Sequence, residues 1–427
     1  MINQRLTTAE TAARLGVKPA TVYAYVSRGL LHPERGPRGS TFDRHEVALL
    51  ARSARHPGEG SPGRRTGREP GAGTAPAGGP AGEPIFVTEL TLIAGGGLYY
   101  RGRHATDLAA RWSFEQAAEW LWTGAEKPAG WSWAAPSDPG DRVAAAVAGL
   151  GPEVLPVERL MVATVAAALG DDLRHDLDPS RVPATGRRLL GVLAAALPLA
   201  GLPPGRPGHP GMAELSWRGL TRRRPAGADL AATGAALVLA ADHELAPSTL
   251  AVRVAASFRA DPYAVVLTGL GPSAGSWPAG STGAPGEVEA LLERAAETGA
   301  ERAIGEHLRR SGQVPHGFGM PLYPGGDPRG RALLGRLSAV GDPARREVVR
   351  GVLRVGRERG FPPPNFDLGL GALSFCAEMV PGAGQALFTL GKVAGWLAHA
   401  MEEYARPTRF RIRADYAGAA PEVSSGS

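Results

Sequence analysis

Side chains that can move protons and bind anions occur in four short motifs in the second half of the chain. An aspartate can take up a proton, a neutral histidine can donate a hydrogen bond, and an arginine presents a planar fork of N–H donors that suits a carboxylate. The motifs are Ala241–Thr249 (ADHELAPST), Asp327–Arg329 (DPR), Pro364–Asp367 (PNFD) and Arg413–Tyr416 (RADY). The one cysteine, Cys376, excludes an internal disulfide and a cysteine-based metal site.

The segments that position these side chains are predicted to be helical. Val87–Leu92 alternates as a strand does, Gly95–Gly97 allows a turn and Leu98–Arg101 returns, which indicates a short hairpin. Strands and helices do not alternate afterwards, so this part is predicted to be mainly α, without a parallel α/β sheet. Helices are expected, for example, at Trp112–Thr123, Val143–Leu150, Val157–Ala168, Leu189–Leu197, Asp229–Ala240, Val288–Ala300 and Gln385–Tyr404.

The N-terminal part differs in charge and in pattern. Residues 1–65 contain eleven Lys/Arg and five Asp/Glu, whereas the other 362 residues have 36 of each, which points to a nucleic acid partner at one end only. Residues 57–84 include 15 Gly or Pro among 28 and cannot form a core. We therefore expect a small domain at 1–55, a flexible Gly/Pro-rich linker at 56–84 and a large domain at 85–427.

Residues 1–55 resemble the winged helix-turn-helix of the MerR and excisionase families. Two short helices, Thr8–Leu15 and Lys18–Val26, flank Gly16, and a charged turn follows at 34–39. The resemblance implies that the second helix enters the major groove of DNA and that the wing contacts phosphates. The implied DNA-binding residues are Lys18, Thr21, Tyr23 and Arg28 around the helix, with Arg35 and Arg38 on the wing. The alternative is a small domain that serves protein contacts.

The large domain resembles the citrate synthase family, whose motifs occur here in the family's order. The ADHELAPST stretch at 241–249 is the most specific match, and it is similar to the family's A-D-H-E-x-x-x-S-T. The other matching segments are Leu98–Gly102, Ser113–Leu121, Gly317–Gly319, Asp327–Arg329, Pro364–Asp367, Gly395–His399 and Arg413–Tyr416.

The resemblance implies a large and a small helical domain, the small one at about 262–366, and a dimer. Its reaction joins an acyl-CoA, acetyl- or propionyl-CoA, to oxaloacetate or a related 2-oxo acid, with no cofactor. Asp367 would be the base and His243 the donor to the thioester oxygen. Arg329 and Arg413 would bind carboxylates, with Lys392 where the family has another arginine.

Three departures bear on this activity. The family's G-F-G-H run, whose histidine polarises the ketone, is here Gly317–Met320, and a thioether donates no proton. The family's G-P-L-H-G-G-A segment is replaced by residues 275–285, which contain no histidine. Lys392 keeps the charge of an arginine without its bidentate fork. His316, four residues before Met320, is one candidate for the same space. His209 lies near where the family has another acceptor-binding histidine, but its proline-rich setting favours an ordinary loop histidine.

Two functions of different class remain open. The first is a condensing enzyme, impaired by Met320. The second is a non-catalytic, ligand-sensing DNA-binding regulator, or a partner subunit that pairs with an intact paralogue as a heterodimer. The chain start lacks the apolar core of a signal peptide, and the longest apolar run, about 189–202, is too short to span a bilayer. We expect a soluble cytoplasmic protein without a membrane partner.

Overall fold

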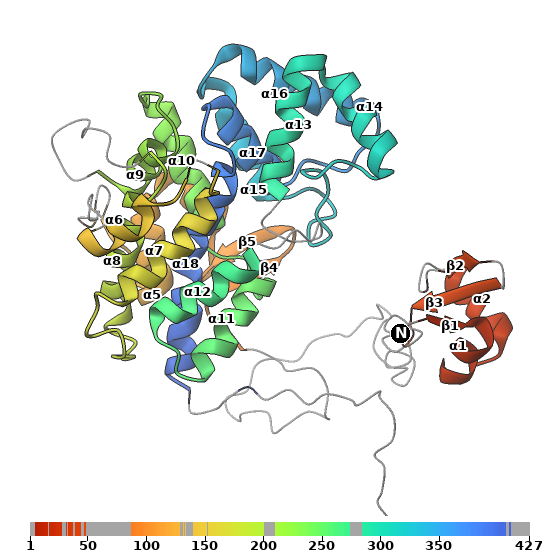
Figure 1. Cartoon of the computed structure of the whole chain (residues 1–427), viewed down its shortest axis with the longest axis horizontal. Helices are drawn as coiled ribbons and strands as arrows, with labels where there is room; N and C mark the ends of the chain where they lie inside the picture. Colours follow the sequence, from red (N-terminus) through yellow and green to blue (C-terminus); the bar gives the residue numbers. More distant parts are fainter. Residues whose placement is uncertain are drawn as a thin grey trace, which may run out of the picture. The chain divides into compact units, whose positions relative to one another are not determined.

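A computed structural model describes residues 5–15, 17–27, 31, 33–36, 39–43, 47, 87–128, 131, 133, 140–151, 153–199, 210–273, 284–406 and 410. The chain divides into two compact units, Met1–Gly82 and Glu83–Ser427 (Figure 1).

The first unit is a small winged helix-turn-helix, as the sequence predicts. Helices α1 (Thr8–Leu15) and α2 (Pro19–Ser27) precede a hairpin of β2 (Pro33–Gly36) and β3 (Gly39–Asp43). Strand β1 (Arg5–Thr7) pairs with the other edge of β3, so the antiparallel sheet has the order β1-β3-β2. A separate apolar core holds these elements together and comprises Ala12, Val22, Leu31, Phe42 and Val47.

The second unit opens with a hairpin that starts later than its alternating pattern suggests. Strand β4 spans Thr91–Ala94, β5 spans Gly97–Tyr100, and β6 (Arg103–His104) completes an antiparallel sheet. The predicted strand at Val87–Leu92 is therefore wrong in its first four residues. The carbonyl of Val87 accepts hydrogen bonds from the side chains of Arg253 and Arg406 instead of joining a strand ladder.

The rest of the described part of this unit is helical, which confirms the mainly α prediction. Helix ends follow local capping: α5 begins at Phe114 rather than Trp112 because Ser113 and Gln116 form a reciprocal capping box. The helices are α4 (Ala105–Arg111), α5 (Phe114–Thr123), α6 (Asp141–Ala148), α7 (Pro156–Ala168), α8 (Val182–Ala195), α9 (Met212–Leu220), α10 (Gly227–Ala240), α11 (Pro247–Ser257), α12 (Pro262–Ser273), α13 (Ala284–Thr298), α14 (Ala300–Ser311), α15 (Pro328–Arg336), the 3₁₀ helix η1 (Leu337–Ala339), α16 (Pro343–Glu358), α17 (Phe366–Cys376) and α18 (Ala383–Tyr404).

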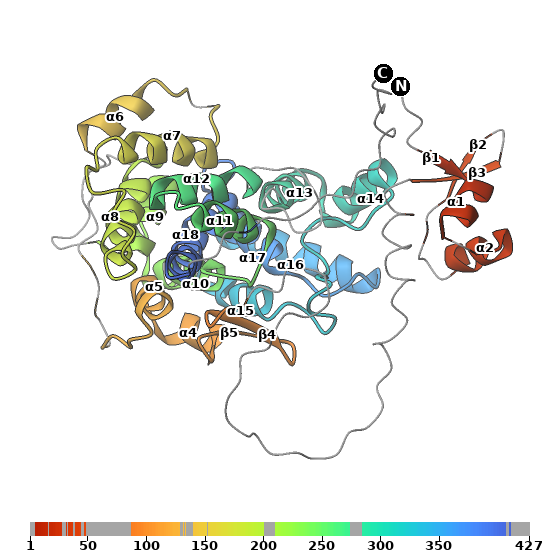
Figure 2. The ribbon, with the colours of Figure 1, turned by 90° about the horizontal axis from the view of Figure 1, so that it is seen from below.

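Helix α18 is the centre of the second unit and is buried along almost its whole length. Figure 2 shows it nearly end-on, with α5, α8, α10, α11 and α12 around it, and all five pack against it. An all-round apolar helix is expected to be buried in this way. At Gly391 an added Cβ would lie 2.7 Å from the carbonyl oxygen of Leu237, so a glycine is needed for the close approach of α18 to α10.

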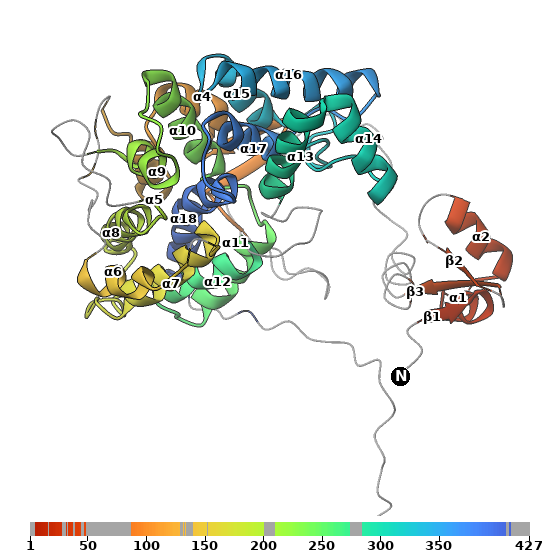
Figure 3. The ribbon, with the colours of Figure 1, turned by 45° about the horizontal axis from the view of Figure 1, so that its top comes forward.

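Helices α13 to α17 form a second group beside this bundle (Figure 3). Helix α17 packs against α13, α15, α16 and α18, so it joins the two groups, and the start of α15 lies against the start of α17. Within the described residues, no helix is both long and apolar enough to cross a membrane. The end of α10, the starts of α15 and α17, and α18 carry the predicted site.

Candidate active site

His243 follows the end of α10, where two contacts fix the course of the chain. The hydroxyl of Tyr100, on β5, accepts a hydrogen bond from the backbone N–H of Asp242 (3.2 Å) and lies 3.0 Å from the Asp242 carbonyl oxygen. On α18, a Cβ at Gly395 would lie 2.3 Å from the carbonyl oxygen of Ala241. Helix α18 therefore presses directly on the segment that presents His243.

Asp242 is a fully buried carboxylate that organises this segment. Its Oδ1 lies 3.3 Å from Nζ of Lys392, and its Oδ2 lies 3.0 Å from Nε2 of His399 and accepts a hydrogen bond from the hydroxyl of Thr91. Burial opposes ionisation, yet His399 and Lys392 hold the pKa of Asp242 below its ordinary value.

The sequence predicts that Lys392 binds a substrate carboxylate. It is itself fully buried, and its ammonium group contacts Asp242 and Thr249.

Arg253 extends this network to the end of α18. Its Nη1 donates to Nδ1 of His399 (2.8 Å) and to Glu402 (2.8 Å), and its Nη2 donates to Glu403. Since Nδ1 of His399 is an acceptor, Nε2 carries the proton and donates it to Asp242. Glu402 also accepts the backbone N–H of Glu89 (2.9 Å), so the network reaches the first described residues of the second unit.

His243 is held as a neutral imidazole. Burial, followed by the charges of Arg329 and Lys392, lowers the pKa of His243 well below its ordinary value, although Asp242 opposes the shift. Its Nε2 lies 3.0 Å from the hydroxyl of Tyr323. A neutral imidazole can donate one hydrogen bond, which is the role that the family resemblance implies for His243.

Asp367 lies in the first turn of α17, where Asn365 is the N-cap residue. Oδ1 of Asn365 accepts hydrogen bonds from the backbone N–H groups of Asp367 (3.0 Å) and Leu368 (3.2 Å). Burial raises the pKa of Asp367 to about 7; Arg329 opposes this shift and Asp327 adds to it. A carboxylate with such a pKa is suited to act as a general base near neutral pH.

Arg329 is fixed between the starts of α15 and α17. The carboxylate of Asp327, the N-cap residue of α15, accepts hydrogen bonds from Nε (3.1 Å) and Nη2 (2.9 Å) of Arg329, and from the backbone N–H of Phe366 (3.2 Å). The guanidinium carbon lies 4.9 Å from the centre of the Phe366 ring, and only 3% of Arg329 is exposed. Arg329 influences the pKa of both His243 and Asp367, which places one cation within electrostatic reach of both.

The loop at Gly317–Met320 is tied to the segment that precedes Asp367. Asn365 donates its backbone N–H to Gly317 (2.9 Å) and its Nδ2 to the carbonyl of Gly319 (2.9 Å), and Gly319 donates to the carbonyl of Pro363 (2.8 Å). Both glycines have positive φ values, 97° and 81°. The carbonyl of Met320 then accepts the N–H of Tyr323 (2.9 Å), a turn that brings Tyr323 to His243.

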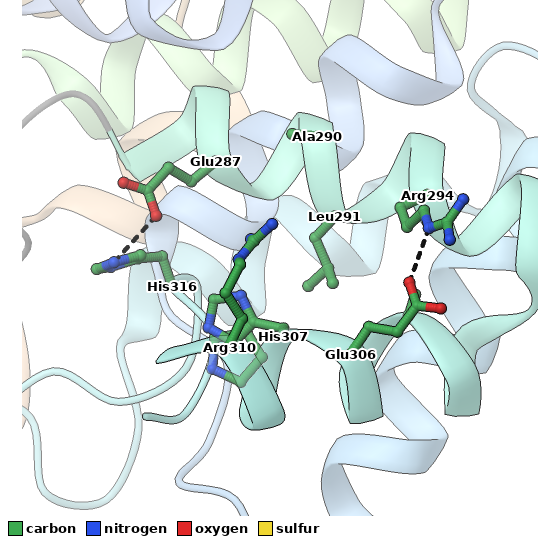
Figure 4. A pocket seen from close by; sticks show the side chains of 10 residues that line it. Glu287, Ala290, Leu291, Arg294, Glu306, His307, Arg310 and His316 are labelled. Atoms are coloured by element: carbon green, nitrogen blue, oxygen red, sulfur yellow. Dashed lines mark hydrogen bonds and ion pairs between the residues drawn. The ribbon is translucent and has the colours of Figure 1, made fainter. Parts of the chain in front are cut away.

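The imidazole of His316 is paired with a carboxylate on α13. Its Nε2 lies 3.0 Å from the carboxylate of Glu287, in a cleft of about 510 Å³ between α13 and α14 (Figure 4). Arg294 and Arg310 also line this cleft. The imidazole of His316 is therefore paired with Glu287, and no hydrogen bond joins it to His243 within the described residues.

Several predicted residues fall outside the described part of the chain. Arg413, His209 and residues 275–283 lie there, as do Arg28 and Arg38. Arg35 lies on β2, but its side chain is not among those described. On the first unit, Lys18 precedes α2 and is exposed, Tyr23 on α2 is 57% exposed, and Thr21 is half-buried.

Sequence reasoning missed Tyr323 and the Arg253–His399–Asp242 chain. Asp242 and His399 are members of matched motifs, so their presence in the site could have been anticipated. Tyr323 lies between two motifs, and only the turn at Met320 places its hydroxyl 3.0 Å from His243.

Comparison with known families agrees with this arrangement. Residues 79–413 match the family described as citrate synthase, C-terminal domain, and residues 6–55 match the MerR HTH family of regulatory proteins. The chain belongs to the citrate synthase family and carries a MerR-type helix-turn-helix at its N-terminus.

Individual relatives differ in how much of the chain they match. Citrate synthase 2 of Bacillus subtilis is 29% identical over 212 residues, which are 49% of this chain and 56% of that protein, so the match spans about half of the relative. The 2-methylcitrate synthase of Mycobacterium tuberculosis is 27% identical over 368 residues, 81% of this chain and 92% of that protein.

Solved structures show the same fold. The citrate synthase of Thermoplasma acidophilum, solved as a ternary complex with carboxymethyl coenzyme A and oxaloacetate, superposes with a TM-score of 0.64 at 24% identity, covering 79% of this chain and 95% of that one. The citrate synthase of Thermotoga maritima gives the same TM-score at 21% identity.

Proposed function

We propose that the protein condenses an acyl-CoA, acetyl- or propionyl-CoA, with oxaloacetate or a related 2-oxo acid. The observation that carries this proposal is the combination of Asp367, whose pKa is raised to about 7, with the neutral imidazole of His243, both under the influence of Arg329. A base that is poised near neutral pH, a neutral hydrogen-bond donor and a fixed cation are the groups that such a condensation requires.

Each step follows from these groups. Asp367 removes a proton from the carbon next to the thioester, and the electron pair moves onto the thioester oxygen, where an N–H of His243 stabilises it. The thioester carbonyl then re-forms as that carbon bonds to the ketone carbon of the acceptor, and the alkoxide that results takes up a proton from water. Water finally cleaves the thioester and releases CoA and the tricarboxylic acid.

Arg329 is the proposed anchor for an acceptor carboxylate. Two of its nitrogens are bound to Asp327, and its Nη1 makes no hydrogen bond with any described residue, so it has a donor left for a ligand. We assign Arg413 to the same task. Lys392 would act through its charge, because its ammonium group is already bound to Asp242.

Met320 limits the proposed reaction. It stands where the family has a histidine that polarises the ketone, and loss of such a donor costs about 10²- to 10⁴-fold in rate. We therefore expect slow turnover. The test is CoA release by the full chain with acetyl-CoA or propionyl-CoA, with and without oxaloacetate; release that does not depend on the acceptor would count against condensation.

A ligand-sensing DNA-binding regulator is the second candidate. It is supported by Met320 together with the helix-turn-helix unit, on which Lys18 and Tyr23 are exposed. A partner subunit for an intact paralogue is a variant of this idea. Absence of turnover, with oxaloacetate still raising the melting temperature and altering DNA affinity, would favour the regulator over the enzyme.

We further infer a homodimer, because the resemblance implies a site completed by Arg413 from a neighbouring subunit. Light scattering on the full chain should give twice its 44.3 kDa. A monomer at micromolar concentration would contradict this assignment of Arg413.

A further inference from the structure

The residues on both sides of His243 are bound by one strand, β4. The hydroxyl of Thr91 donates a hydrogen bond to Oδ2 of Asp242, and the backbone N–H of Ile93 donates to Oε1 of Glu244 (2.7 Å). Each contact joins residues that are 151 positions apart in the sequence. Strand β4 therefore holds the segment that carries His243 at two points, one directly before it and one directly after it.

The register of the hairpin explains why the N–H of Ile93 is available to Glu244. Strand β4 lies at the edge of the sheet β4-β5-β6, and its two-residue turn closes on the pair Ala94–Gly97. Hydrogen-bonded and non-hydrogen-bonded pairs alternate from such a turn, so the next pair, Ile93–Leu98, is a non-hydrogen-bonded one. The N–H of Ile93 consequently points away from β5, and the carboxylate of Glu244 supplies the acceptor that an edge strand lacks.

Glu244 adopts a backbone conformation that residues with a side chain rarely adopt. It lies in the short connection between α10 and α11, and its φ is 50°, in the left-handed region. There the Cβ atom crowds the backbone, a penalty that only glycine escapes. Such a residue keeps its conformation because the surrounding structure holds it. The hydrogen bond with Ile93 ties the Glu244 side chain to the hairpin, so it is the contact that can hold this turn.

We propose that Glu244 is a positioning residue: by binding the N–H of Ile93 it holds the left-handed turn after His243 and thereby fixes the place of the imidazole. Without this anchor the imidazole could move relative to the hydroxyl of Tyr323, which lies 3.0 Å from its Nε2. A displacement of about 1 Å in a site can cost about 10²-fold in rate. The inference rests on the proposed function only in that His243 contacts the substrate, and it holds for whichever substrate atom that is.

Three variants of the full chain separate the anchor from the backbone conformation. Glu244→Gln keeps an acceptor oxygen for Ile93, Glu244→Ala removes it and keeps the unfavourable φ, and Glu244→Gly removes it and relieves the φ. We expect kcat/KM for CoA release to stay within about twofold in Glu244→Gln and to fall about tenfold to a hundredfold in the other two. The melting temperature of Glu244→Gly should exceed that of Glu244→Ala. Wild-type kcat/KM in Glu244→Gly, or equal losses in Glu244→Gln and Glu244→Ala, would overturn the proposal.

Glu378→Gly is the matched control. Glu378 also has a left-handed φ, 53°, but its carboxylate is paired with Arg223 in the connection between α17 and α18. The same substitution relieves the same backbone conformation there and should leave kcat/KM unchanged. A loss of kcat/KM in Glu378→Gly as large as in Glu244→Gly would mean that the effect is not specific to the turn after His243.

A spectrum tests the position of His243 without turnover. In the full chain labelled with ¹⁵N-histidine, His243→Gln identifies the signals of His243 among the ten histidines. We expect these signals to shift in Glu244→Gly and to stay at their wild-type positions in Glu244→Gln and Glu378→Gly. Unchanged signals in Glu244→Gly would overturn the proposal. If the wild type releases no CoA, the proposed function fails, while the spectrum still decides whether Glu244 positions His243.

Discussion

Asp367 derives its proposed role from its surroundings. In water an aspartate is ionised above about pH 4 and is a weak base. Here burial raises its pKa to about 7, despite Arg329. We therefore expect kcat/KM to fall below about pH 7, because the base must be ionised to accept the substrate proton. An acid limb near pH 4 would contradict the assignment.

The same shift makes a prediction about stability. The folded-state pKa of Asp367 lies above its unfolded value, so the stabilisation it provides is complete below about pH 4 and is lost as pH rises through about 7. Asp367→Asn stays neutral at every pH. Its melting temperature relative to wild type should rise between pH 4 and pH 8, by the equivalent of roughly 1–4 kcal/mol. A difference that does not vary with pH would mean that Asp367 titrates normally.

Met320 supplies the third prediction at this scale. Met320→His restores a donor at the family's position, and a hydrogen bond to developing charge is worth about 1.5–3 kcal/mol, so CoA release should rise about tenfold or more. The double variant with Asp367→Ala should be inactive. A fall in activity in Met320→His would instead show a pocket adapted to an acceptor with an apolar group near the thioether.

Residues at the N-termini of α15 and α17 hold the parts of the site together. Asn365 caps α17 and also donates to the carbonyl of Gly319, so it joins the base to the glycine loop. Asn365→Ala should cost about 1 kcal/mol of stability, the usual value of a cap, and should lower kcat as well. Asp342→Ala removes the cap of α16 (2.8 Å to the N–H of Ala344) and should cost similar stability without a change in kcat. If both variants lowered kcat equally, the proposed role of Asn365 in joining Asp367 to the glycine loop would be refuted.

Much at this scale could be predicted from sequence, and the exceptions have physical reasons. Periodicity predicted α10 and α18 to within two residues, because each buries an almost continuous apolar surface. It misplaced the strand at Val87, where side chains of Arg253 and Arg406 capture the carbonyl. It could not find Tyr323 or the burial of Lys392, since both depend on how segments distant in sequence meet.

The two units of the whole molecule suggest two activities in one chain. The first unit carries the excess positive charge of the sequence, and Lys18 is exposed before α2. The full chain should bind duplex DNA with an affinity that falls steeply as salt rises, because bound cations displace counterions. Lys18→Ala should weaken binding and reduce the salt slope by about one. Lys127→Ala removes the same charge from the second unit and should have no effect; no binding at low salt would favour a protein-contact role for the first unit.

In the proposed reaction this chain forms a carbon–carbon bond between an acyl-CoA and a 2-oxo acid. Mass spectrometry of a reaction containing doubly ¹³C-labelled acetyl-CoA and unlabelled oxaloacetate tests it most directly. We expect slow accumulation of a tricarboxylic acid that carries both labelled carbons, together with free CoA, and none of it from Asp367→Ala. Release of labelled acetate alone would mean thioester hydrolysis without condensation, and no labelled product from either wild type or Met320→His would contradict the enzyme.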